Sequence, residues 1–173
     1  MNRLLGIVFL ILFSKVGFAQ LESDLKLADH YYSQGEYDKA RPYYEAVYKT
    51  NPSKIYLTRL LSCLEAEGDL KQAERVLKKA KVKSPADLDL KIQLAVFYEE
   101  HEAPSKAKKA YESLLENFIV NPSKGIALFN AFVALSKIDY AERVLQISQT
   151  EFKNYPFHFQ QADLSSLTNR KGE

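Results

Sequence analysis

Four alanines recur along the chain at a nearly constant interval, and this spacing limits the folds that the sequence can adopt. They are Ala40, Ala73, Ala107 and Ala141, and each follows the one before it after about 34 residues. The segment 73–77 is also repeated in residues 141–145. A fixed period of this size is typical of solenoid proteins, in which each period is one small supersecondary unit.

Each period contains two stretches with apolar residues three and four positions apart, which predicts two helices. Gly35 and Gly68 mark turns between the helices, and Pro52 and Pro85 follow the second helix. We expect Pro42 to kink or delay its helix. The expected helices are residues 21–33, 37–49, 55–66, 70–82, 88–100, 104–118, 126–135 and 138–152, with a last one starting near Phe157. The sequence therefore predicts an all-α fold, an α-solenoid of antiparallel helix pairs.

The residues at fixed places in each period point to one family. The first copy carries Ala28, Tyr31, Ala40, Tyr44 and Pro52, and the other copies carry related residues at most of these places. This pattern resembles the tetratricopeptide repeat, a helix–turn–helix unit of about 34 residues. The family's tryptophan is absent from every copy. The resemblance implies about four units and a C-terminal single helix, at residues 21–53, 54–87, 88–121, 122–155 and 156–173. In this reading Asn121-Pro122-Ser123 closes the third unit.

Residues 1–19 have the pattern of a secretory signal peptide. Arg3 is followed by an apolar run at 4–13, and Gly17-Phe18-Ala19 supplies small residues before a cleavage point after Ala19. The apolar run is shorter than the roughly 20 residues that a membrane-spanning helix needs. We therefore expect an exported protein, periplasmic or extracellular, of the bacterial type, with no membrane span after cleavage.

Charge and composition exclude several classes of function. The chain has 24 basic and 22 acidic residues, so removing Arg3 and Lys15 leaves 22 of each and argues against nucleic acid as a partner. The three histidines lie in different repeats without metal-ligand spacing, and no phosphate-binding glycine loop or nucleophile elbow is present. We therefore predict no enzyme, no cofactor and no metal. The single cysteine, Cys63, is interpreted as a core or boundary residue.

The family resemblance implies a binding surface on the first helices of the repeats, with certain positions facing a groove. Apolar residues there would otherwise be exposed, and exposed apolar patches often mark interaction sites. The predicted groove residues, called the inner-face residues below, are Leu25, Asp29, Tyr32, Thr58, Ser62, Glu65, Ile92, Val96, Glu99, Ile126, Asn130 and Val133.

Two functions follow from this reading. The first is a non-enzymatic scaffold that binds a protein or peptide partner in the cell envelope. The alternative is a structural subunit, or the N-terminal part, of a larger envelope assembly, because residues 156–173 correspond to half a unit. That helix acts either as a C-terminal cap or as the start of a longer array. The sequence does not name the partner, the biological process or the oligomeric state.

Overall fold

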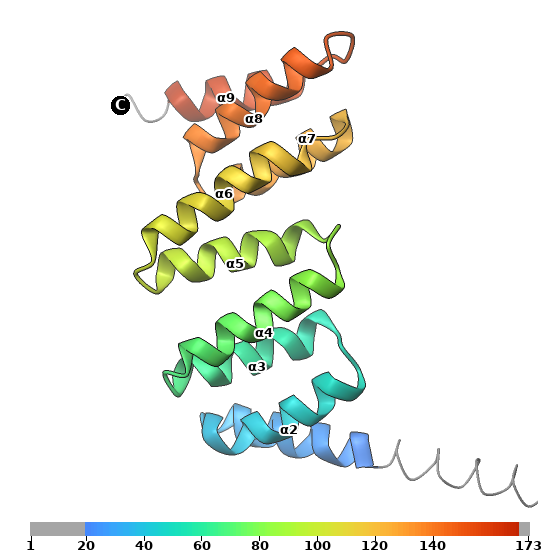
Figure 1. Ribbon diagram of the computed structural model, residues 1–173, viewed down its shortest axis with the longest axis vertical. Coiled ribbons are helices and arrows are strands. Elements are labelled where there is room, and N and C mark those ends of the chain that lie inside the picture. Colours follow the sequence, from blue (N-terminus) through green and yellow to red (C-terminus); the bar gives the residue numbers. More distant parts are fainter. Residues whose placement is uncertain (1–19, 170–173) are drawn as a thin grey trace, which may run out of the picture. The chain divides into compact units, whose positions relative to one another are not determined.

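The computed structural model describes residues 20–169, and all its regular secondary structure is helical. A helix at residues 20–33 comes first, and Figure 1 shows the helices that follow it. They are α2 (Tyr37–Thr50), α3 (Lys54–Ala66), α4 (Leu70–Lys83), α5 (Leu88–Glu100), α6 (Pro104–Phe118), α7 (Pro122–Ala134), α8 (Ile138–Glu151) and α9 (His158–Asn169). The predicted all-α fold of antiparallel helix pairs is confirmed. The expected signal segment lies outside the described residues. None of the described helices is both long and apolar enough to cross a membrane.

The chain divides into two compact units, residues 1–76 and residues 77–173, with the boundary inside α4. We call them unit 1 and unit 2. In unit 1, α2 packs against α3. In unit 2, α5 packs against α6, α7 packs against α8, and α6 and α9 add contacts to α7 and α8. Neighbouring helices in sequence are therefore neighbours in space within each unit.

A residue in the left-handed backbone conformation ends the first helix of each of the four predicted repeats. Gly35 and Gly68 have φ of +73° and +74°, and Glu102 and Ser136 have φ of 54° and 57°. These positions recur at the same intervals that separate the alanines. Backbone bonds close the turns in the same way, for example from Asp69 N–H to Leu64 C=O at 2.8 Å. The repeat is thus present in the backbone as well as in the side chains.

The core of each unit consists of the periodic apolar residues. The alanines that define the repeat are all buried, and so are the larger residues one turn later, Tyr44 and Leu77, Tyr111 and Leu145. Small residues let two helices approach closely in α7 and α8, because a Cβ added at Gly125 would overlap Ser148 Oγ. The Ser148 side chain is 1% exposed. Close approach at small residues fits the dense packing of protein interiors.

One sequence prediction about proline is wrong, and another is wrong in part. Helix α2 is not delayed by Pro42, since it begins at Tyr37 and runs to Thr50, whereas the expected kink stays a prediction. The carbonyl that loses its helical partner belongs to Asp38, an exposed residue near the helix start that water can reach. Pro122 opens α7 rather than closing the preceding repeat. Asn121 caps this helix by accepting a 2.9 Å hydrogen bond from Lys124 N–H, and the first helical position tolerates proline.

Candidate protein-interaction surface

The inner-face residues of unit 1 lie on two helices. Residues Leu25, Asp29 and Tyr32 belong to the helix at 20–33, and α3 carries the other three, Thr58, Ser62 and Glu65. None of the six is buried: Asp29 and Thr58 are exposed and the other four are half-buried. Half-buried side chains on a helix surface can contribute to both the fold and a contact with a partner.

A buried tyrosine fixes one of these side chains. Tyr44 is fully buried on α2, and its hydroxyl donates a 2.6 Å hydrogen bond to Asp29 Oδ1. Burial raises the pKa of Tyr44, and the hydrogen bond to the Asp29 carboxylate raises it further. The Asp29 carboxylate is therefore held at a defined place while its residue stays exposed.

A cation–π contact joins the helix at 20–33 to α3. The Arg59 guanidinium lies 4.3 Å from the centroid of the Tyr32 ring. The Tyr32 and Tyr44 rings pack edge to face, with their centroids 5.8 Å apart. Tyr32 thus contacts Tyr44 of α2 and Arg59 of α3.

Unit 2 contains the other six inner-face residues. Ile92, Val96 and Glu99 are on α5, and α7 carries the rest, Ile126, Asn130 and Val133. The four apolar residues of this set are half-buried, whereas Glu99 and Asn130 are exposed. Unit 2 therefore presents a more apolar inner face than unit 1.

Two partners contact the one carboxylate of this set. The Tyr111 hydroxyl donates a 2.9 Å hydrogen bond to Glu99 Oε2, and Lys137 Nζ forms an ion pair with Glu99 Oε1. The hydrogen bond from Lys137 lowers the pKa of Glu99 most, partial burial opposes this shift, and the Tyr111 hydroxyl lowers the pKa to a smaller extent. Lys137 follows α7, so this contact ties the C-terminal end of α5 to that of α7.

Comparison with known proteins assigns the family. Residues 25–87 match the model of the tetratricopeptide repeat. This part of the chain belongs to the tetratricopeptide repeat family. The match covers the first two predicted repeats, in which both turns carry glycine.

Three solved structures, one of them of a tetratricopeptide repeat (TPR) protein, are similar to this chain at low sequence identity. A TPR protein from Parabacteroides merdae is 16% identical over 87% of this chain, with a TM-score of 0.47, and this chain spans 60% of its length. PcrH from Pseudomonas aeruginosa is 16% identical over 73% of this chain and 92% of its own, with a TM-score of 0.48. The type III secretion translocator chaperone SycD from Yersinia enterocolitica is 17% identical over 78% and 96%, with a TM-score of 0.47. No curated protein sequence matches this chain. All three TM-scores are below 0.5, and these likenesses carry no further argument.

The TPR pattern predicted the inner-face residues but not the side chains that hold them. Tyr44 and Tyr111 occupy the same repeat position, and each donates its hydroxyl to a carboxylate of the preceding helix. A tyrosine at a buried repeat position is the signal that could have found these bonds, because a buried hydroxyl needs a partner. Arg59 and Lys137 gave no such signal, since they are ordinary charged residues in sequence.

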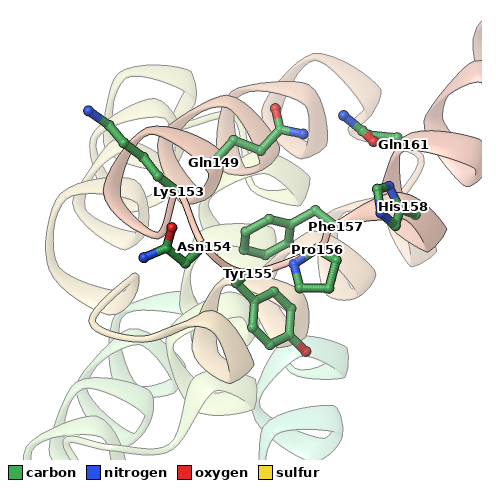
Figure 2. Close-up of a pocket in the computed structure, with 8 residues that line it drawn as sticks. All are labelled: Gln149, Lys153, Asn154, Tyr155, Pro156, Phe157, His158 and Gln161. Carbon is green, nitrogen blue, oxygen red and sulfur yellow. The ribbon is translucent and has the colours of Figure 1, made fainter.

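Sequence reasoning also missed a depression at the turn between α8 and α9. It has a volume of about 520 Å³ and is lined by Gln149, Lys153, Asn154, Tyr155, Pro156, Phe157, His158 and Gln161. Figure 2 shows the Phe157 ring in the middle of this group, with Lys153 and His158 on opposite sides. In sequence these residues read only as a loop between two helices.

Reactive chemistry is not evident in the described part of the chain. Residues 20–169 contain no group of three or more His, Cys, Asp or Glu side chains that could hold a metal ion. Cys63 is buried on α3, and burial raises the pKa of its thiol to about 11. A thiol with a raised pKa is a poor nucleophile at neutral pH.

Proposed function

We propose that this TPR protein is a non-enzymatic scaffold that binds a protein or peptide partner through its inner-face residues. The observation that carries the proposal is the half-buried apolar set of unit 2, formed by Ile92, Val96, Ile126 and Val133. A folded domain gains by covering such side chains, at roughly 25 cal/mol per Å² of apolar surface removed from water. Because Glu99 forms an ion pair with Lys137, covering this surface with an apolar segment does not leave an unpaired charge.

The test is a double substitution on α5, Ile92→Asp with Val96→Lys. Both residues are half-buried on the same helix, and the change leaves the net charge constant. The variant and the parent protein are immobilised and used to capture proteins from the envelope extract of the source cells. We expect the variant to lose the proteins that the parent retains, because the substitutions place charges on the apolar contact surface.

A matched control separates a lost surface from a lost fold. Lys108→Glu with Glu116→Lys also leaves the net charge constant, but both residues are exposed on the second helix α6. This control should capture the same proteins as the parent, and circular dichroism should give equal helix content for all three. Undiminished capture by the α5 variant would rule out the inner face as the binding surface.

Export to the cell envelope is the other part of the proposal. It is supported by Arg3, the apolar residues 4–13 and the small residues before Gln20. Mass spectrometry of the protein from the source cells should find Gln20 as the first residue and the protein in the envelope fraction. A cytosolic protein that retains residues 1–19 would contradict export.

A further inference from the structure

The depression between α8 and α9 combines aromatic walls with hydrogen-bonding side chains, none of which is acidic. Its lining contains a lysine and a histidine but neither aspartate nor glutamate. We propose that this depression is a second docking site, and that its occupant is a segment of a partner protein in which an apolar side chain stands next to a carboxylate. None of the eight lining residues is an inner-face residue, so this proposal goes beyond the function proposed above.

The aromatic part of the depression would hold the apolar side chain. Phe157 is 4% exposed and Tyr155 is 42% exposed, and their ring centroids are 4.9 Å apart at an angle of 54°. Pro156 lies between them in sequence and also lines the depression. Figure 2 shows the Tyr155 ring and Pro156 next to the Phe157 ring. A partly open aromatic surface of this kind binds apolar groups and remains accessible to a partner.

The polar part would meet the carboxylate and the peptide groups beside it. Three carboxamides, from Gln149, Asn154 and Gln161, share the lining with Lys153 and His158. These five side chains form no hydrogen bond or ion pair with any residue between 20 and 169. Carboxamides can bond both the N–H and the C=O groups of a peptide. The lysine supplies the positive charge that an acidic side chain needs, and the imidazole supplies a further donor.

Local charges do not oppose this assignment. The acidic residues closest in sequence are Glu151 on α8 and Asp163 on α9, and neither lines the depression. Lys153 and His158 lie on opposite sides of Phe157 in Figure 2, so a carboxylate on either side of an inserted ring meets a nitrogen donor. The volume of about 520 Å³ falls in the range of about 300–1,000 Å³ that is usual for ligand pockets. One or two side chains with their backbone fit that space.

The experiment is a titration of the protein with three small probes, followed by the backbone amide signals in nuclear magnetic resonance spectra. The probes are acetyl-Phe-Glu-amide, acetyl-Phe-Gln-amide and acetyl-Ala-Glu-amide. We expect the first probe to shift the amide signals of Tyr155, Phe157 and His158. The glutamine probe should bind about three- to fivefold more weakly, as for loss of one partly exposed ion pair. The alanine probe should bind more weakly still, because it lacks the ring.

Variants assign the effect to the depression. Tyr155→Ala removes a partly exposed ring, and Lys153→Gln with His158→Gln removes the lysine charge and the imidazole, all at exposed positions. The control, Lys108→Gln with Lys109→Gln, removes two exposed lysines from α6. Binding should fall in the first two variants and stay constant in the control.

Three results would overturn the proposal. They are equal binding of the glutamate and glutamine probes, an equal loss of binding in the α6 control, and signal shifts confined to residues outside 149–161. The inner-face substitutions Ile92→Asp with Val96→Lys should leave the titration unchanged, so failure of this site and failure of the proposed scaffold function can be told apart.

Discussion

The two units place different residues at the left-handed backbone position of their turns. In unit 1 the left-handed position is Gly35 or Gly68, with φ of +73° and +74°. In unit 2 the same position is Glu102 or Ser136, with φ of 54° and 57°. Glycine adopts this conformation freely, whereas other residues lose roughly 1–2 kcal/mol. The repeat therefore requires the conformation and not the glycine, and in unit 2 the packing of the helices must hold an unfavourable residue in place.

The buried tyrosines show the same relationship. Tyr44 in unit 1 donates to Asp29, and Tyr111 in unit 2 donates to Glu99. The tyrosines occupy equivalent places, but Glu99 lies one helical turn later in its repeat than Asp29 does in its own. In unit 2 a longer side chain from a later helical turn reaches the same kind of hydroxyl. The tyrosine belongs to the repeat pattern, whereas the carboxylate that accepts its hydrogen bond stands at a different position in each repeat.

The largest expected effect comes from truncating either tyrosine. Tyr44→Ala and Tyr111→Ala should each lower the free energy of unfolding by about 3–5 kcal/mol, as for other buried aromatic residues. Hydrogen exchange of the native protein should show where the loss falls, because repeat proteins are stabilised mainly by neighbouring contacts. We expect faster exchange in residues 20–76 for the first variant and in residues 77–169 for the second.

Phenylalanine at the same positions provides the control for that pair. Tyr44→Phe and Tyr111→Phe keep the ring and remove only the hydroxyl, so each should cost about 0.5–1.5 kcal/mol. Equal stability losses for alanine and phenylalanine would mean that the rings contribute little packing. That outcome would contradict the equivalence of the two positions as core positions of the repeat.

A smaller effect is expected at the turns, and its sign should differ between the units. Gly68→Ala should destabilise unit 1 by about 1–2 kcal/mol, because alanine is strained at positive φ. Ser136→Gly should stabilise unit 2 by about 0.5–1 kcal/mol, because the relief of strain exceeds the added entropy of the unfolded chain. Urea denaturation of both variants would measure this contrast. A destabilised Ser136→Gly variant would show that the serine side chain contributes more than its backbone strain costs.

The sequence predicted the elements of this fold better than their polar contacts. The alanine spacing and the apolar pattern predicted the helices because burial is periodic, and the buried positions of Ala40, Ala73, Ala107 and Ala141 agree with it. Pro122 was misread because the same residue can follow one helix or open the next, and only the cap formed by Asn121 decides between them. The contact between Glu99 and Lys137 spans 38 residues and depends on how successive helices pack. No local pattern reports such a contact, and the same holds for the depression beside Phe157.

The smallest effect concerns Lys137, the cation that pairs with Glu99 in addition to the tyrosine hydroxyl. Glu99 and Lys137 are 45% and 28% exposed at their side chains, so their ion pair should contribute no more than about 1 kcal/mol. The ion pair is better detected through the pKa of Glu99. Because Lys137 lowers the pKa of Glu99, this carboxylate stabilises the folded state above the pKa it has when unfolded, about 4.3, and that stability is lost as the pH falls through the lower folded pKa.

Lys137→Met should raise the pKa of Glu99 toward its ordinary value and reduce the loss of stability on acidification. Carbon-13 spectra of the glutamate carboxyl groups can follow this change, with Lys108→Met on the exposed face of α6 as the control. If Glu99 titrates identically in the parent and in Lys137→Met, then Tyr111 alone holds the carboxylate, and the two units differ only in which turn supplies the acid.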